Sequence, residues 1–247
     1  MSAVLVTGGS RGIGAAVARL AAARGYDVCI NYVSNEAAAQ EVIAAVEAEG
    51  RKGCAIHADV ANPLQVEQLF EQANSALGRI SGLVNSAGLT GPAGTLSETT
   101  VAAIERVINV NVLGTILCSR EALRWMAHSA GGEGGAIVNI SSVAAEIGSP
   151  GEFVWYAASK GAIDSFTVGL AREVGDDGVR VNAVAPGLIE TDIHEAAGLP
   201  NRARDMAPGV PMRRPGSAEE AAEPILWLLS EAASYVTGAV IRVSGGR

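Results

Sequence analysis

Aromatic and charged side chains are both scarce in this sequence, and their scarcity narrows the class of protein. Phe, Trp and Tyr make up 4% of the 247 residues and charged residues 18%, whereas 49% are hydrophobic and 30 residues are glycine. This is the composition of a globular protein with a well-buried core. Because large aromatic side chains are few, we expect helices and sheet to pack closely through small residues.

Excess positive charge is also absent. The formal net charge is −8, and a phosphate backbone or an anionic membrane surface requires clustered Lys and Arg. The densest basic stretch is the pair at 213–214, which we interpret as part of a solvated loop. We therefore expect neither a nucleic acid nor a membrane as partner.

Cysteines and long apolar runs are rare as well. Cys29, Cys54 and Cys118 are far apart and show no C-x-x-C or metal-type spacing. We expect them to be small buried hydrophobes in a reducing compartment. The first residues lack the apolar core of a signal peptide, and no run approaches the roughly 18 uninterrupted apolar residues of a membrane span. We therefore expect a cytoplasmic protein.

What the sequence does contain is a regular alternation of short β-branched runs with longer Ala-, Leu- and Glu-rich segments. The runs cover residues 3–7, 28–32, 54–60, 83–87, 136–142, 179–186 and 239–243. They are almost continuously apolar, as strands buried on both faces are. Strand–helix–strand repetition predicts an α/β fold with a parallel sheet, right-handed crossovers and helices on both faces. Because no linker interrupts the pattern, we expect a single domain over residues 1–247.

One interval breaks this rhythm. Residues 187–217 are rich in Pro and Gly and have only weak helical patterning. Long connections in compact domains are commonly lids or binding loops. Because this one follows a predicted strand, we predict a substrate-binding lid at about residues 187–217, with a passive insertion as the alternative.

The first predicted strand leads into a glycine-rich turn, TGGSRGIG, and then into a predicted helix. Gly8, Gly12 and Gly14 follow a G-x-x-x-G-x-G spacing. Glycines permit positive φ and let the backbone approach a pyrophosphate, while free N–H groups at the helix start face its negative charge. The turn therefore predicts a dinucleotide site.

The end of the second predicted strand indicates which dinucleotide binds. An NAD site generally has an acid there for the ribose 2′-hydroxyl. Here Asn31 and Tyr32 end the strand, and the next carboxylate is Glu36 in the following helix. A 2′-phosphate would instead meet the cation of Arg11 and the neutral donors Ser34 and Asn35. We predict NADP(H), with NAD(H) as the alternative.

The landmarks taken together resemble a known family. In order, TGGSRGIG, NSAG (85–88), Asn111, ISS (140–142), YAASK (156–160) and PGLIET (186–191) resemble those of the short-chain dehydrogenase/reductases. The chain is most similar to the 3-oxoacyl-carrier-protein reductases and their glucose-dehydrogenase-like relatives, over essentially its whole length. The resemblance implies a Rossmann-type, doubly wound sheet of seven parallel strands and a nicotinamide cofactor. It also implies a homotetramer built partly on the helices that carry Asn111 and Tyr156.

The glycine turn and the resemblance together assign a set of cofactor-binding residues. These are Gly8, Ser10, Arg11, Gly12, Ile13, Gly14, Asn31, Tyr32, Ser34, Asp59, Val60, Asn85, Ala87, Gly88, Tyr156, Lys160, Pro186, Gly187, Ile189 and Thr191. One departure is Ser86, which stands where relatives have a second asparagine, and we expect this change to be tolerated.

The chemistry expected of Tyr156 follows from hydride transfer. Reducing a ketone leaves an alkoxide, which needs a proton donor nearby. A free tyrosine has a pKa of about 10, and Lys160 lies four residues later on the same helical face. A positive charge about 4 Å away would lower the phenol pKa by roughly three units at most. We predict Tyr156 as proton donor, with Lys160 both tuning the phenol and, by resemblance, binding the nicotinamide ribose.

Two further residues complete the predicted catalytic set. Ser142 ends the fifth predicted strand, where its hydroxyl would donate to the substrate carbonyl oxygen. Ser141 is a second candidate, because the interval to Tyr156 is one residue longer than in many relatives. By resemblance, Asn111 holds a water that relays protons to Lys160.

Three functions remain open from the sequence. The first is NADPH-dependent reduction of a ketone, such as a 3-oxoacyl thioester or a related small β-keto compound. The second is oxidation of a sugar or secondary alcohol, and the third is a cofactor-binding regulator without turnover. Basic residues of the predicted lid are candidates for docking an acidic acyl carrier protein, with a solvated loop as the alternative: Arg202, Arg204, Arg213 and Arg214. The histidines show no metal-type or catalytic grouping and are interpreted as structural or surface residues: His57, His128 and His194.

Overall fold

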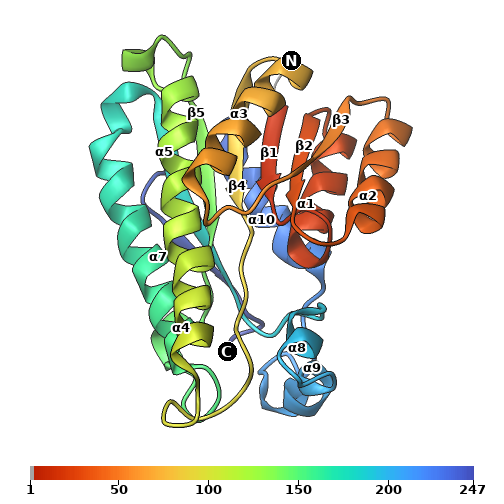
Figure 1. Ribbon diagram of the computed structural model, residues 1–247, viewed down its shortest axis with the longest axis vertical. Coiled ribbons are helices and arrows are strands. Elements are labelled where there is room, and N and C mark those ends of the chain that lie inside the picture. Colours follow the sequence, from red (N-terminus) through yellow and green to blue (C-terminus); the bar gives the residue numbers. More distant parts are fainter. Residues whose placement is uncertain (1–2) are drawn as a thin grey trace.

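Seven short strands form one parallel sheet in the order β3-β2-β1-β4-β5-β6-β7, with helices on both faces (Figure 1). The computed structural model describes residues 3–247. The strands are β1 (Ala3–Thr7), β2 (Asp27–Tyr32), β3 (Gly53–His57), β4 (Ile80–Asn85), β5 (Gly135–Ile140), β6 (Val179–Pro186) and β7 (Val240–Val243). The doubly wound seven-stranded sheet expected from the sequence is confirmed.

Two helical layers cover the sheet. One face carries α1 (Gly12–Ala23), α2 (Glu36–Ala48) and α10 (Ala218–Leu229), and the other carries α3 (Pro63–Leu77), α5 (Thr115–Met126) and α7 (Val154–Glu173). Helix α4 (Val101–Ile108) continues through the π-helical turn η1 (Asn109–Gly114) into α5, and α6 (Ala144–Ile147) precedes α7. Single 3₁₀ turns cover His128–Ala130, Gly175–Asp177, Ala207–Gly209 and Glu231–Ala233.

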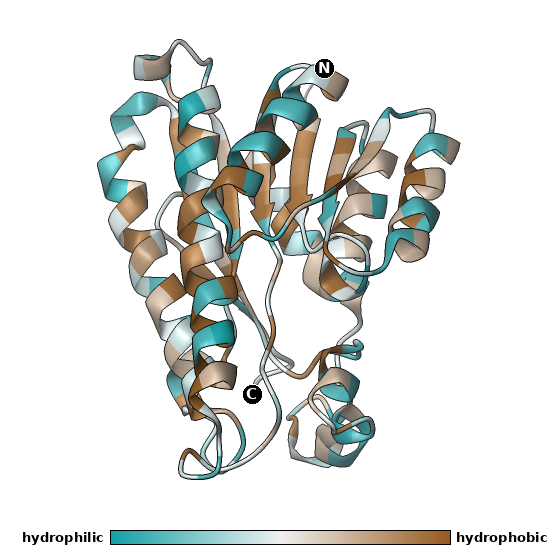
Figure 2. Ribbon diagram, in the orientation of Figure 1, coloured by the Kyte–Doolittle hydropathy of each residue, from teal (hydrophilic) through white to brown (hydrophobic). Residues whose placement is uncertain are grey.

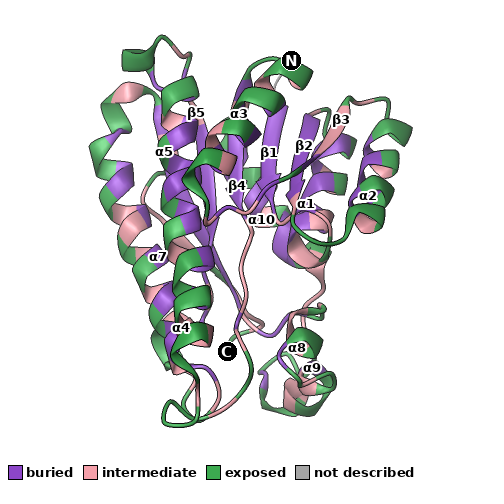
Figure 3. Cartoon of the chain, viewed as in Figure 1, coloured by how far each residue is buried: buried purple, intermediate pink, exposed green. Residues whose placement is uncertain are grey.

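The five central strands are largely buried on both faces, as their apolar runs predicted, whereas the edge strands β3 and β7 are only partly buried (Figures 2 and 3). Successive side chains of a strand point to opposite faces. In β1, Leu5 therefore joins the cluster under α3, α5 and α7, whereas Val4 and Val6 join the cluster under α1, α2 and α10. Small residues such as Ala18 and Ala21 let α1 lie close to the sheet.

The helix that contains Asn111 has an unusual composition. Residues Val101–Met126 form a helix that is long and apolar enough to cross a membrane, by length and composition only. The sequence did not indicate this helix because polar residues interrupt its apolar ones. Its buried face, including Leu117, Cys118 and Met126, belongs to the core cluster beneath the sheet. Packing in the α/β core thus accounts for the apolar character of that face.

The strand boundaries differ from the sequence prediction at β5. The predicted run ended at residue 142, whereas the strand ends at Ile140. The chain still donates from Ser141 N to Val184 O and from Val143 N to Pro186 O, but it turns into α6 at once. Ser142 therefore lies two residues beyond the strand, above the carboxyl edge of the sheet.

The segment 187–217 is more ordered than its composition suggested. It contains α8 (Ile193–Ala196) and α9 (Arg202–Met206), which lie below the sheet in Figure 1. Its two ends are joined by a bridge between Ile189 and Gly216, and Leu188, Ala203 and Val210 form a small apolar cluster of its own. The segment is thus a folded element attached to the carboxyl edge of the sheet.

Candidate active site

A cavity of about 600 Å³ lies at the carboxyl edge, between the glycine turn, the ends of β4 and β5, α7 and the segment 187–217. Most residues predicted for the site line it: Gly8, Ser10, Arg11, Gly12, Ile13, Gly14, Asn31, Tyr32, Ser34, Asp59, Val60, Ala87, Gly88, Ser142, Tyr156, Lys160, Pro186, Gly187, Ile189 and Thr191. Two predicted residues, Asn85 and Asn111, are not among the lining residues.

The glycine turn has the geometry that its sequence predicted. Gly8 and Gly12 have φ of 62° and 52°, in the left-handed region that favours glycine. A Cβ on Gly14 would lie 2.4 Å from the Gly8 carbonyl oxygen, so only glycine fits where the helix meets the turn. Helix α1 begins without a side-chain cap, whereas α2, α3, α4 and α10 are each capped. Its first N–H groups are thus left for an anion such as a pyrophosphate.

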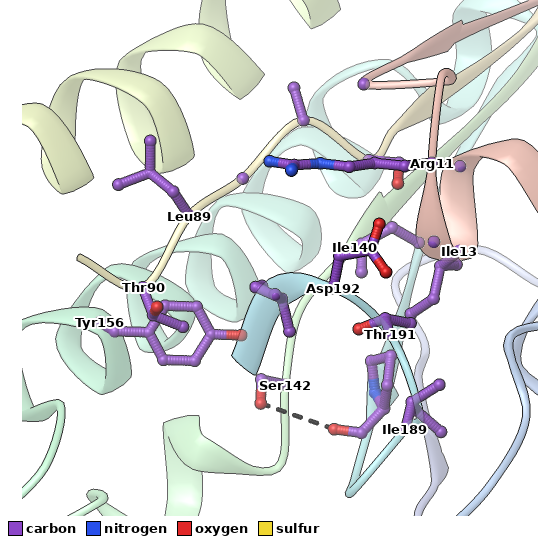
Figure 4. Close-up of a pocket in the computed structure, with 18 of the residues that line it drawn as sticks. Arg11, Ile13, Leu89, Thr90, Ile140, Ser142, Tyr156, Ile189, Thr191 and Asp192 are labelled. Atoms are coloured by element: carbon purple, nitrogen blue, oxygen red, sulfur yellow. Dashed lines mark hydrogen bonds between the residues drawn. The ribbon is translucent and has the colours of Figure 1, made fainter. Parts of the chain in front are cut away.

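Arg11 is the one cation of this turn. It is exposed, and among residues 3–247 no side chain forms an ion pair with it. In Figure 4 its side chain extends along the cavity. Asn35 is occupied in capping α2, where its side chain accepts from Ala38 N at 3.0 Å. Arg11 and Ser34 therefore offer the donors that a 2′-phosphate would need.

Asn31 and Asp59 line the cavity near the ends of β2 and β3, where their side chains fix the surrounding backbone through hydrogen bonds. Asn31 accepts from Gly8 N at 3.2 Å and donates to Ala58 O at 2.6 Å, so its side chain supports the glycine turn from below. Asp59 accepts from Ala61 N and from Arg106. Partial burial acts to raise the pKa of Asp59, but these two donors outweigh it and lower that pKa. Asp59 is thus held as a carboxylate.

The prediction for Asn85 needs a correction. Its side chain turns away from the cavity and donates to Ser119 Oγ at 3.0 Å and to Asn139 Oδ1 at 2.9 Å. Asn85 is the last residue of β4 and pairs in register with Asn139 of β5, so the amide lies between strand and helix layer. Sequence spacing alone did not reveal this cross-strand partner.

Tyr156 and Lys160 lie next to each other on α7, but their electrostatics differ from the prediction. Lys160 Nζ is 5.7 Å from the centroid of the Tyr156 ring and donates to Ile140 O at 2.7 Å. Burial raises the pKa of Tyr156 above its ordinary value, opposed by a hydrogen bond to Ser142 and by the charge of Arg202. The expectation that Lys160 lowers this pKa is therefore wrong for this structure.

The reason lies in the lysine itself. Lys160 is buried, and desolvation lowers its pKa to about 8. Its ammonium is directed to a backbone carbonyl, and Asp164, one turn further along α7, is the charge that supports its protonation. A Cβ on Gly88 would lie 3.6 Å from Lys160 Nζ. The amine therefore lies beside the loop that follows strand β4.

The two candidate serines point in different directions. Ser142 Oγ accepts from Ala144 N at 3.1 Å and donates to Pro186 O at 3.5 Å, and its hydroxyl acts to lower the pKa of Tyr156, whose phenol lies on the same side of the cavity (Figure 4). Ser141 is buried and donates to Lys160 O at 3.4 Å, and its hydroxyl acts to lower the pKa of Asp164. The geometry favours Ser142 as the hydroxyl beside the phenol.

Asn111 connects the elements around Lys160 instead of lining the cavity. It accepts from Leu89 N at 2.9 Å and donates to Leu89 O at 2.9 Å and to Ser159 Oγ at 3.0 Å. It lies in the π-helical turn η1, a geometry that often marks functional positions. Its side chain therefore fixes the loop after β4 against α7, and its role in a water relay stays a prediction.

Some residues that line the cavity were not predicted as site residues. His194 was interpreted as structural or surface, and Arg202 as a docking residue on the lid, yet both line the cavity. Phe153 and Arg247 line it as well. Arg204, Arg213 and Arg214 are exposed, and Arg214 pairs with Glu220. The sequence gives no local signal for these positions because the folding of the segment 187–217 determines which side chains face inward. No group of three or more potential metal ligands occurs among residues 3–247.

Comparisons with known proteins agree with this architecture. Residues 8–247 match the family model described as Enoyl-(Acyl carrier protein) reductase. An uncharacterized oxidoreductase of Escherichia coli, YgfF, is 49% identical over 100% of both chains. A 3-oxoacyl-[acyl-carrier-protein] reductase of Synechocystis is 39% identical, covering 98% of this chain and 95% of that one. Glucose 1-dehydrogenase 2 of Bacillus subtilis is 36% identical, covering 98% and 93%.

Solved structures show the same fold. A short-chain dehydrogenase from Burkholderia cenocepacia in complex with NADP has a TM-score of 0.91 and 36% identity, covering 99% of this chain and 97% of that one. A blue fluorescent protein from a metagenomic library in complex with NADPH has a TM-score of 0.90 and 38% identity, with the same coverage. The chain therefore belongs to the short-chain dehydrogenase/reductase family, a family of oxidoreductases.

Proposed function

We propose that this protein is an NADPH-dependent reductase of a ketone, with a 3-oxoacyl thioester or a related small β-keto compound as substrate. The observation that carries the proposal is that Ser142, Tyr156 and Lys160 line one cavity, which also contains the glycine turn and the uncapped start of α1. Two structural neighbours bind NADP or NADPH, which supports the choice of cofactor.

Each part of the cavity has a task in this reaction. The N–H groups at the start of α1 bind the cofactor phosphates, and Arg11 with Ser34 binds the 2′-phosphate. When bound, the nicotinamide supplies the hydride. Ser142 donates a hydrogen bond to the substrate carbonyl oxygen, and Tyr156 gives that oxygen its proton as negative charge develops. Lys160, beside both, holds the ribose and the phenol in place.

The phenol of Tyr156 is in the protonated form that a reduction requires of its proton donor. Because burial raises the pKa of this phenol, it stays protonated and serves as a proton donor. Oxidation of an alcohol requires a proton acceptor instead, so it should become faster as pH rises. The alternative, a sugar or secondary-alcohol dehydrogenase, is supported by the glucose dehydrogenase relative. A regulator without turnover is the weakest candidate, because the serine, tyrosine and lysine all remain in place.

The experiment that tests the proposal compares two reactions of the purified protein. Loss of NADPH absorbance with ethyl acetoacetate, and with a 3-oxoacyl thioester on coenzyme A or on acyl carrier protein, measures reduction. Formation of NADPH from NADP⁺ with glucose or a secondary alcohol measures oxidation. We expect reduction to be faster at pH 7. Faster glucose oxidation at that pH would favour the alternative, and NADPH binding without any turnover would favour the regulator.

We also propose a cytoplasmic homotetramer, with residues 187–217 acting as the substrate lid. Three free cysteines support a reducing compartment. Exposed apolar residues on the long helix that contains Asn111, such as Leu113 and Ile116, support an interface there.

A further inference from the structure

Arg202 of α9 is a cation folded into the substrate end of the cavity. Its side chain is only 10% exposed and pairs with Glu152, the residue before Phe153 in the loop that leads into α7. Its guanidinium lies over the Phe153 ring, 5.6 Å from the centroid. The charge of Arg202 lowers the pKa of Tyr156, so the guanidinium lies close enough for its field to act on the phenol.

The segment 187–217 packs against α4, α7 and the loop after β4. Ala197 and the partly buried Leu199, which join α8 to α9, pack in one cluster with Val107 of α4 and Trp155 of α7. Ala93 N donates to Ala197 O at 3.2 Å, which fixes the segment to the loop after β4. The burial of Arg202 therefore follows from packing of the whole segment.

Two buried nitrogen atoms at this end have no hydrogen-bond partner. They are Arg202 Nε and His194 Nε2, and they are among five such side-chain atoms in residues 3–247. The His194 ring uses a hydrogen bond to the backbone of Ile189, and burial, followed by the charge of Arg202, lowers its pKa. Leaving a buried guanidinium N–H unpaired is costly, so the site is incomplete without an acceptor.

The charges at this end are not balanced within the cavity. Arg247 also lines it, and burial and the nearby Arg202 lower the pKa of Arg247. Glu152 is the carboxylate that acts on both guanidinium groups, and Asp192, whose residue is exposed, also lines the cavity. One anionic group bound here would neutralise the second guanidinium and would favour protonation of His194, whose Nε2 could then donate to it.

We propose that Arg202 and His194 bind a carboxylate of the substrate, so that the ketone reduced at Tyr156 is a keto acid. This inference rests on the proposed reductase function and, of the substrates proposed there, selects a small keto acid over a 3-oxoacyl thioester. Because the charge of Arg202 also acts on Tyr156, its removal changes turnover of every ketone. The informative quantity is therefore the ratio of kcat/KM for an acid to kcat/KM for its methyl ester.

The test uses two matched pairs with NADPH as the second substrate: acetoacetate with methyl acetoacetate, and 4-oxopentanoate with methyl 4-oxopentanoate. We expect the parent to prefer at least one acid over its ester. In Arg202→Met the acid-to-ester ratio should fall roughly 10- to 100-fold, the loss of a charged hydrogen bond, with most of the fall in KM for the acid. Arg202→Lys should recover part of the ratio, and Arg19→Met, an exposed arginine of α1, should leave it unchanged.

The outcomes separate this inference from the proposed function. A parent that reduces the esters but prefers neither acid overturns the inference, whatever Arg202→Met does, and leaves the reductase proposal standing. An equal loss for acid and ester in Arg202→Met also overturns it, because a general effect on Tyr156 would then suffice. A parent that binds NADPH but reduces no ketone overturns both.

Discussion

At the level of single residues, burial determines how protons are held at this site. Lys160 is buried beside the phenol, and its pKa falls to about 8 because its ammonium has left water for a single backbone carbonyl. The phenol of Tyr156 is desolvated too, and its pKa rises. The two groups thus shift in opposite directions, each toward its neutral form. The phenol therefore stays protonated at neutral pH, whereas Lys160 loses its proton near pH 8.

The depressed pKa of Lys160 predicts a pH dependence of stability. Between about pH 8 and 10.5 the unfolded state holds the lysine proton more tightly than the folded state. The free energy of unfolding contributed by this residue should therefore rise with pH across that window, by at most about 1.4 kcal/mol per pH unit. Urea unfolding at several pH values should show this rise in the parent relative to Lys160→Met. Parallel curves for the two proteins would contradict the assignment.

The contact between Ser142 and Tyr156 predicts unequal effects for two neighbouring serines. Ser142→Ala removes the hydroxyl beside the phenol and should lower kcat by roughly 100-fold or more, with little effect on NADPH affinity. Ser141→Ala removes a buried hydrogen bond to Lys160 O and should retain most turnover. Steady-state kinetics of both variants with one keto ester decide the matter. The reverse ranking would make Ser141 the catalytic serine.

At the level of elements, local sequence rules explain β1 and the glycine turn, but they do not explain the positions of Arg202 and Asn85. The run 3–7 became β1 with the same bounds, and the glycine turn adopted the positive φ values that its spacing required. These features depend on neighbouring residues only. The inward position of Arg202 depends on α9 packing against residues far away in the chain, and Asn85 depends on a partner in another strand. Distant contacts of this kind leave no periodic pattern in the sequence.

The glycine turn gives a prediction at the same scale. In Gly14→Ala the new methyl would meet the Gly8 carbonyl oxygen at 2.4 Å, so the turn and the start of α1 must shift. We expect about 1–3 kcal/mol of lost stability together with weaker NADPH binding, measured by urea unfolding and by fluorescence titration. Gly169→Ala, at an exposed position of α7 with open space around the new methyl, should be neutral or more stable by about 0.5–1 kcal/mol. Equal behaviour of both variants would contradict the steric argument.

At the level of the whole molecule, the chain leaves apolar side chains on the outside of the helix that carries Asn111. Leu113 is 40% exposed and Ile116 is 36% exposed. Exposed apolar residues that gather on one helix favour an interface. Because the inner side of the same helix holds the loop after β4 through Asn111, association of subunits would also stiffen the wall of the active site.

This arrangement predicts the state of assembly in solution. Light scattering coupled to size-exclusion chromatography should give the mass of a tetramer for the parent. Leu113→Glu combined with Ile116→Glu should shift the mass toward dimers or monomers and lower turnover. A charge change on the opposite face of the sheet, as in Arg19→Glu at an exposed position of α1, should leave the mass unchanged. A monomeric parent would contradict the proposed homotetramer.

The most direct test of the account concerns the proton that Tyr156 supplies to the reduced carbonyl. Turnover of a keto ester and NADPH affinity should be measured side by side for Tyr156→Phe and for Tyr235→Phe, whose tyrosine is fully exposed. We expect kcat of Tyr156→Phe to fall roughly 100- to 10,000-fold while NADPH affinity stays near that of the parent, and Tyr235→Phe to match the parent in both. Turnover of Tyr156→Phe within a few-fold of the parent would show that the phenol is not the proton donor.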